Sequence, residues 1–189
     1  MKIKPMKKAG RVSVELSRGD EPMLERSVTA AVRTPFAIKK ILVPVDFSAC
    51  SKKALDYAIP FAKQFGASLT LLYVVPANFP VGEFGMIDVA FMEKELREGG
   101  EKQLAELTAT QIGREVRSSS SVRVGRPVTE IADVARKENI DLIIISTHGH
   151  AGLKHVLLGS VTENVVRYAP CPVLVVREHE HEFVKDLTE

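Results

Sequence analysis

Residues 146–160 hold the residue types and spacing best suited to binding an anionic ligand. Glycine lets a backbone turn with positive φ and lets N–H groups approach phosphate oxygens. Gly159 and Ser160 open a predicted helix at residues 160–168, where free N–H groups and the helix dipole favour an anion. Ser160 also fits a capping box, with Ser160 as N-cap and Glu163 at N3, and this structural role is compatible with binding. The segment therefore predicts a phosphate site.

The histidines of this segment suggest two other kinds of chemistry. Nucleotidyltransferases of related α/β architecture use His-x-Gly-His near the end of their first strand, but here Thr147, His148, Gly149 and His150 follow the predicted fourth strand. As metal ligands, His148 and His150 lack a nearby acid or Cys partner. We therefore expect solvated loop histidines and no metal site. The sequence also shows no nucleophile with a base and an orienting group, so we assign no catalytic residue.

Alternating strands and helices must position the phosphate segment. Short apolar runs predict strands at residues 41–45, 68–75, 141–145 and 172–176, and residues 115–124, which alternate poorly but are rich in β-forming residues at their end, predict another. Helical spacing predicts helices at residues 54–65, 88–111 and 160–168, and another that begins near Pro127. Pro60 suggests a kink or a break in the first helix, and Gly99 and Gly100 weaken the second.

This order predicts an α/β fold with a five-stranded, doubly wound parallel sheet covered on both faces. Ligands of such sheets bind at the carboxyl ends of the strands that flank the point where the winding reverses. If the first and fourth strands are neighbours, the loops at that point begin at Asp46 and Ser146. The residues alone therefore nominate these two loops.

Charge divides the chain into three parts. Residues 1–40 carry ten Lys/Arg and four Asp/Glu, residues 178–189 carry one Lys and five Asp/Glu, and the middle is balanced. We predict a mobile N-terminal extension at residues 1–37, a domain at 38–177 and a C-terminal tail at 178–189. Alternation at Val12 and Val14 leaves a short strand open for the extension. Because the basic excess lies outside the domain and aromatic residues are 6%, we expect no nucleic-acid partner.

The composition also indicates the cellular compartment. No apolar run approaches the ~20 residues of a membrane helix, and the basic N-terminus lacks the apolar region of a secretory signal. The two cysteines, Cys50 and Cys171, form neither a disulfide framework nor a metal-spaced cluster. We therefore expect a cytoplasmic protein without a membrane partner.

Three segments resemble the universal stress protein family. Gly149, nine further residues, Gly159 and Ser160 match the second half of that family's nucleotide-binding signature, Gly-x2-Gly-x9-Gly-Ser/Thr, whereas Ser146 replaces its first glycine. Residues 43–48 and 169–176 are similar to the family's first and last strands. The resemblance covers about residues 38–177 and implies the Rossmann-like fold of the adenine-nucleotide alpha hydrolases.

The resemblance also implies a nucleotide site. Asp46 would contact the adenosine, Val74 would lend backbone contacts to adenine, and the glycine segment would hold the phosphates. The alternative for Asp46 is a helix N-terminal cap or a partner of the helix dipole, and the alternative for Val74 is a plain core position. The implied binding residues are Pro44, Val45, Asp46, Val74, Ser146, Gly149, Gly159, Ser160, Val161 and Thr162.

The resemblance implies a regulatory module of the stress response that binds ATP, with Mg²⁺ as a candidate companion ion. The side chain of Ser146 would either crowd a phosphate or donate a hydrogen bond to it. A slow ATP hydrolase and a dimerising interaction protein with an empty pocket stay open as alternatives. The family resemblance further implies a homodimer paired through the last strand, at residues 172–176.

Overall fold

The computed structural model describes residues 2–5, 12–15, 37–77, 89–147, 159–178 and 184. The chain divides into two compact units, Met1–Ala37 and Ile38–Glu189. In the first unit, strand β1 (Lys2–Pro5) pairs with β2 (Val12–Glu15) in antiparallel fashion. The strand suggested by the alternation at Val12 and Val14 is thus present. Its partner β1 was not expected from the sequence.

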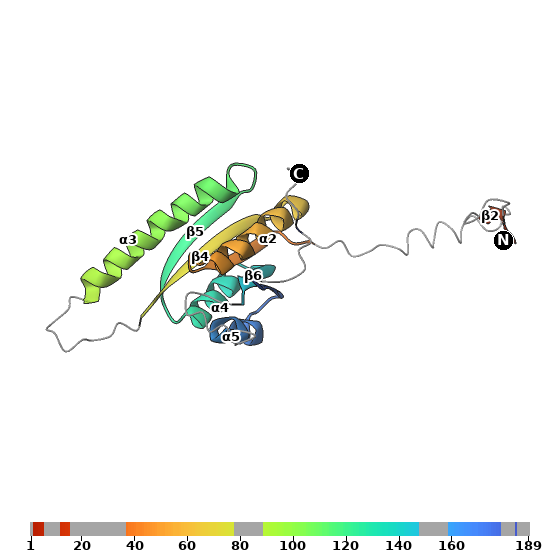
Figure 1. Ribbon diagram of the computed structural model, residues 1–189. Coiled ribbons are helices and arrows are strands. Elements are labelled where there is room, and N and C mark those ends of the chain that lie inside the picture. The colour runs from red at the N-terminus through yellow and green to blue at the C-terminus, as the bar shows by residue number, and fades with distance from the viewer. Residues whose placement is uncertain are drawn as a thin grey trace. The chain divides into compact units, whose positions relative to one another are not determined.

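The second unit is built on a five-stranded parallel sheet in the order β5-β4-β3-β6-β7 (Figure 1). Its strands are β3 (Lys40–Val45), β4 (Ser68–Pro76), β5 (Ser118–Gly125), β6 (Leu142–Ser146) and β7 (Val173–Val176). The helices are α2 (Ala49–Phe65), α3 (Val89–Leu107), α4 (Pro127–Lys137) and α5 (Ser160–Tyr168), and a π-helical turn, Thr108–Ile112, follows α3. The predicted doubly wound α/β fold is confirmed, with its reversal point between β3 and β6.

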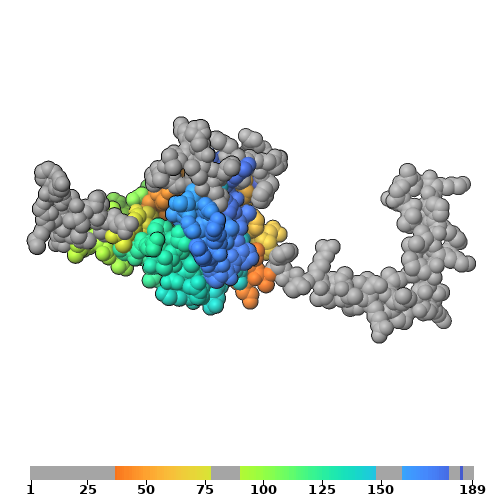
Figure 2. All heavy atoms as spheres, turned by 90° about the horizontal axis from the view of Figure 1, so that it is seen from below, coloured from red at the N-terminus to blue at the C-terminus, as the bar shows by residue number. Residues whose placement is uncertain are grey.

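Each face of the sheet carries its own core. On one face, Leu55 of α2 and Leu104 of α3 pack with Leu69 and other strand residues. On the other, Ile131 of α4 and Val165 of α5 belong to a second buried cluster. Figure 2 shows α4 and α5 next to each other on the surface of this unit. Cover on both faces explains why most of these strands are apolar runs rather than alternating ones, and the edge strand β5, with its four serines, is the exception.

Helix α2 shows which local signals decide its limits. It begins after the N-cap Ser48 and ends at Gly66, whose φ of 65° is left-handed and whose N–H donates to the Ala62 carbonyl. The break predicted at Pro60 is wrong, because α2 continues through that residue. The buried residues Tyr57 and Ala62 on either side hold the helix against the sheet, which offsets the ~3 kcal/mol that proline costs inside a helix.

The two adjacent glycines of α3 predict opposite effects of the same substitution. Gly99→Ala adds a Cβ with no atom within 4 Å, so the free energy of unfolding should rise by about 1 kcal/mol. The same change at Gly100 places a Cβ 2.5 Å from Cδ1 of Tyr73, whose ring also contacts Phe47 with centroids 4.8 Å apart. Overpacking of this kind costs about 1–3 kcal/mol, so Gly100→Ala should destabilise the protein. Urea unfolding of both variants checks this, and equal stabilisation by both would contradict the close packing of α3 on β4.

Candidate functional site

The two central strands separate at their carboxyl ends. Strands β3 and β6 pair at Ile41↔Leu142 and Leu42↔Ile143. The Lys40 carbonyl accepts from the Asp141 N–H, so even-numbered residues of β3 turn their backbone polar groups toward β6. Pro44 is the next such residue, and it has no N–H with which to continue the ladder. The opening expected at the reversal point thus follows from a proline in a central strand.

The ends of β3 and β6 and a position within β4 lie at the same level beside this opening. Val45 pairs with Tyr73, so Asp46 and Val74 follow at one level. Extending the β3–β6 register from Leu42↔Ile143 by four residues places Asp46 level with Thr147. The topology therefore brings the ends of β3 and β6, the two strands whose loops the sequence nominates, together beside Val74 of β4.

Asp46 supports the start of α2 rather than capping it. Its Oδ1 accepts from the N–H and the hydroxyl of Ser48, at 3.1 and 2.6 Å. Ser48 is the N-cap residue, and its Oγ accepts from the Ser51 N–H at 3.2 Å. The alternative that Asp46 itself caps the helix is therefore wrong. The intervening Phe47 has a φ of 65°, which is rare for a large side chain and makes the turn from strand to helix sharp.

Buried backbone contacts join the end of β6 to the start of α5. Thr162 is 4% exposed, and its Oγ1 donates to the carbonyl of Ser146 at 2.7 Å. The N–H of Gly159 donates to the Thr147 carbonyl at 2.8 Å. Ser146 is 7% exposed and, as the last residue of β6, is level with Val176 of β7. Residues 148–158 therefore leave and rejoin the described fold at one place.

The N-terminus of α5 differs from the predicted capping box. Gly159 is the N-cap and has no side-chain cap bond, and the Glu163 N–H donates to the Gly159 carbonyl. The carboxylate of Glu163 instead pairs with Arg167 at 2.8 Å. Gly159 has a φ of −65°, so this position requires no left-handed backbone. The glycine is therefore free of a conformational demand, and its lack of a side chain suits the close approach of a ligand.

The first turn of α5 supplies anion-binding groups. Because the intrahelical bonds begin at Glu163, the N–H groups of Ser160, Val161 and Thr162 come before the helical hydrogen-bond pattern. Ser160 is exposed and Val161 is 37% exposed, so this end of the helix faces solvent. The Gly159 N–H is used within the fold. Such an arrangement can bind a phosphate or another oxyanion.

The remaining predicted residues divide into three groups. Pro44 and Val45 are buried in β3. Val74 is half-buried and packs against the second core cluster, as its core alternative predicts. Gly149 lies outside the described residues, together with His148 and His150.

Sequence reasoning missed two hydrogen bonds near the carboxyl ends of the strands. One is made by the hydroxyl of Thr162, a predicted binding residue, which donates to the carbonyl of Ser146. The other is made by Glu178, which follows β7: its carbonyl accepts from Nζ of Lys53 in α2 at 2.8 Å. Neither contact has a local signal, because each joins residues far apart in the chain.

The cysteine at this edge is not an activated nucleophile. Burial raises the pKa of the Cys50 thiol, and the negative charges of Glu178 and Asp46 raise the same pKa further. The thiol therefore stays protonated at neutral pH. In the parts of the chain that the structure describes, no group of three His, Cys, Asp or Glu side chains could hold a metal ion. None of the helices in those parts combines the length and apolarity needed to cross a membrane.

Comparison with known proteins gives a consistent result. The model of the universal stress protein family matches residues 37–177. The universal stress protein MJ0531 of Methanocaldococcus jannaschii is 36% identical over 144 residues, which cover 76% of this chain and 85% of that protein. YxiE of Bacillus subtilis is 32% identical and covers 73% of this chain and 98% of its own.

Solved structures extend the likeness to three dimensions. The structure of MJ0577, also of Methanocaldococcus jannaschii, has a TM-score of 0.67 at 32% identity and covers 77% of this chain and 99% of its own. A universal stress protein solved in complex with cAMP has a TM-score of 0.50 at 26% identity, with coverages of 76% and 99%. From its sequence, its sheet order and these matches, the chain belongs to the universal stress protein family.

Proposed function

We propose that this protein is a cytoplasmic regulatory module of the stress response that binds an adenine nucleotide, with ATP as the ligand and Mg²⁺ as its companion ion. The observation that carries the proposal is the start of α5, where the N–H groups of Ser160, Val161 and Thr162 precede the helical pattern. This turn lies beside the opening between β3 and β6, where ligands of such sheets bind.

The hydrogen-bonding groups at this place are of the kinds that a nucleotide needs. A triphosphate needs N–H donors and a helix dipole, which the first turn of α5 supplies. The carboxylate of Asp46, half-buried at the same level of the sheet, is an acceptor suited to ribose hydroxyls. The related protein solved with cAMP supports an adenine nucleotide as the ligand class.

Calorimetric titration with ATP and magnesium tests the proposal. We expect saturable binding by the wild type, and Ser146→Gly should keep the affinity within a few-fold because glycine retains the carbonyl that accepts from Thr162. Gly159→Val should abolish binding by blocking the approach of phosphate. Its φ of −65° accommodates valine, so the variant should stay folded. Absence of heat with the wild type would contradict the proposal, and release of ADP over time would favour the slow hydrolase.

We further propose that two copies pair through β7. This strand forms one edge of the sheet, and its residues Val173, Leu174 and Val175 are half-buried in the single chain. In the neighbouring α5, Val166 is 48% exposed and Tyr168 is 63% exposed. Unpaired strand groups beside apolar side chains favour pairing with the same edge of a second copy, under two-fold symmetry.

A further inference from the structure

The other edge of the sheet presents backbone groups of β5. Among the described strands, β5 pairs with β4 alone. The carbonyls of Arg117 and Gly125 accept from the β4 side, from Leu69 and Ala77 at 2.9 and 3.3 Å. Because polar backbone groups alternate in direction along a strand, the even-numbered residues turn theirs outward. The outward-turned residues are Ser118, Ser120, Val122 and Val124.

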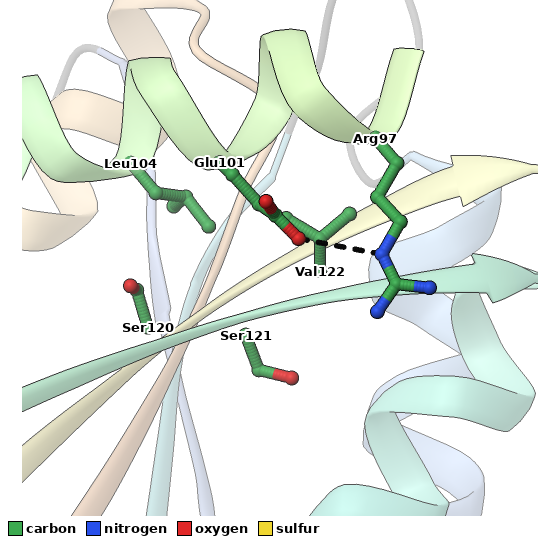
Figure 3. A pocket seen from close by; sticks show the side chains of 6 residues that line it. All are labelled: Arg97, Glu101, Leu104, Ser120, Ser121 and Val122. Carbon is green, nitrogen blue, oxygen red and sulfur yellow. Dashed lines mark hydrogen bonds and ion pairs between the residues drawn. The ribbon is translucent and has the colours of Figure 1, made fainter. Parts of the chain in front are cut away.

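A groove follows this edge beneath α3. One hollow of about 360 Å³ is lined by residues of α3 and by Ser120, Ser121 and Val122 (Figure 3). A second hollow, of about 440 Å³, is lined by residues that follow the middle of α3 and by Ser118, Ser119 and Ser120. Both hollows include Ser120 in their lining. Figure 3 shows Ser120 and Ser121 on opposite faces of β5, with Ser120 on the side of α3.

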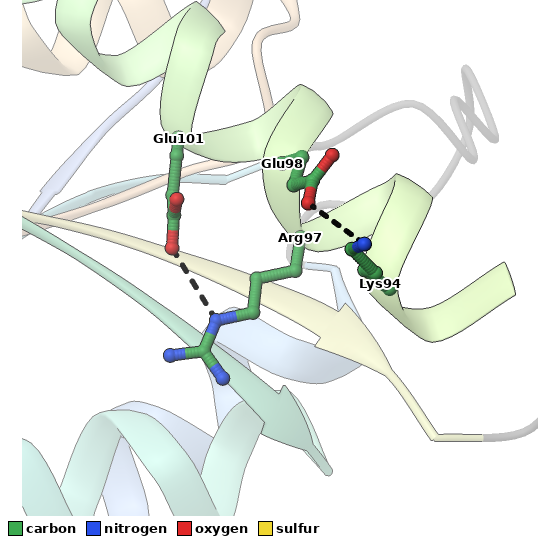
Figure 4. Close-up of polar contacts among 4 residues, drawn as sticks. All are labelled: Lys94, Arg97, Glu98 and Glu101. Atoms are coloured by element: carbon green, nitrogen blue, oxygen red, sulfur yellow. Dashed lines mark hydrogen bonds and ion pairs between the residues drawn. The ribbon is translucent and has the colours of Figure 1, made fainter. Parts of the chain in front are cut away.

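The strand side of the groove is basic, whereas α3 carries five glutamates and three cationic side chains. Four exposed arginines lie in residues 114–126, and the acid among them, Glu115, pairs with Lys63 of α2. On α3, the carboxylates nearest the groove already have cationic partners: Glu101 pairs with Arg97 at 3.3 Å and Glu98 with Lys94 at 3.8 Å (Figure 4). The rim arginines are Arg114, Arg117, Arg123 and Arg126.

We propose that this edge binds an extended acidic peptide segment of a partner protein, which adds a sixth strand beside β5. The backbone of the peptide pairs with the outward groups of Ser118, Ser120 and Val122. Its carboxylates meet the surrounding guanidinium groups, which suit bidentate binding of carboxylates. The site lies at the edge opposite to β7, so it is distinct from the proposed dimer contact and from the proposed nucleotide site.

The composition of the groove favours a peptide over a single-stranded nucleic acid. Proteins that bind single strands stack bases on aromatic side chains. The described residues that line one hollow or the other include serines, a threonine, alanines, Leu104 and Val122, and none of them is aromatic. An edge strand instead offers a ladder of N–H and carbonyl groups, which matches another strand.

Fluorescence anisotropy with a labelled nine-residue peptide that alternates glutamate and threonine tests the proposal on the full-length protein. We expect saturable binding, and weaker binding of a matched peptide that alternates lysine and threonine. Ser120→Pro removes an outward N–H without touching the ladder to β4, and should weaken binding about five- to tenfold. Ser120→Ala, which keeps that N–H, should bind as the wild type does.

A second pair of variants isolates the charge contribution. Arg97→Gln should weaken binding several-fold, whereas Arg167→Gln on α5 should not. The two arginines are matched, because each forms an i,i+4 pair on an exposed helix surface. On the wild type, the amides of Ser120 and Val122 should gain protection from hydrogen exchange when the peptide binds.

Three results would overturn the proposal: no saturation by the glutamate peptide, unchanged affinity in a folded Ser120→Pro variant, or no added amide protection in the wild type. Tighter binding of a twelve-nucleotide thymidine strand than of the peptide would also overturn it.

Discussion

Val175→Glu is expected to convert the protein from a dimer to a monomer. The carbonyls of Pro172 and Val176 accept from residues of β6, so Val173 and Val175 turn their backbone groups to the open edge. Pairing two copies there buries the side chain of Val175 beside its counterpart. An unpaired buried carboxylate costs about 3–5 kcal/mol, so the dimer dissociation constant should rise at least ~100-fold. Light scattering at micromolar concentration measures the change.

A second substitution separates loss of pairing from loss of folding. Val175→Pro removes an outward N–H and leaves the ladder to β6 intact, so it should also yield a folded monomer. Val175→Ile keeps the N–H and the apolar surface, and it should remain a dimer. If the wild type is itself monomeric, or if both disruptive variants stay dimeric, the proposed contact through β7 is wrong.

Thr162→Val should lower both the stability and the nucleotide affinity. The substitution keeps the shape of the side chain but removes the hydroxyl that donates to the Ser146 carbonyl at 2.7 Å. An unsatisfied buried carbonyl costs about 1–3 kcal/mol, and the first turn of α5 loses its tie to the sheet. We expect a fall of that size in the free energy of unfolding and a roughly tenfold loss of ATP affinity, measured by urea unfolding and calorimetry.

Thr162→Ser provides the matched control, since it retains the donor and loses one methyl group. It should keep most of the affinity and part of the stability. Equal losses in the two variants would mean that packing, and not the hydrogen bond to Ser146, holds the start of α5 in place.

The sequence predicts the fold well because four of the five strands of this sheet are short apolar runs, whereas β5, with four consecutive serines, was recognisable only from its β-rich end. Helix limits were also predictable where a residue has one strong preference, as at Gly66 and Pro127. The break at Pro60 was wrong, because local propensity does not report how firmly Tyr57 and Ala62 are buried against the sheet.

The candidate site was predictable in place but not in detail. Strand order brings Asp46 and the end of β6 together, and the sequence alone nominates both loops. The individual roles depend on contacts between distant residues. Ser48, not Asp46, caps α2, and the Thr162 hydroxyl donates to a carbonyl sixteen residues away. A pattern of residue types cannot distinguish a hydroxyl that faces a ligand from one that faces the backbone.

The bonds between the residues on either side of 148–158 have a consequence for changes in chain length. The backbones of Thr147 and Gly159 are joined by a hydrogen bond, and Thr162 adds a bond to the carbonyl of Ser146. For a loop with fixed ends, doubling the length costs only about 0.6 kcal/mol of closure entropy. A change in the number of residues between Thr147 and Gly159 should therefore cost little free energy of folding as long as these bonds stay in place.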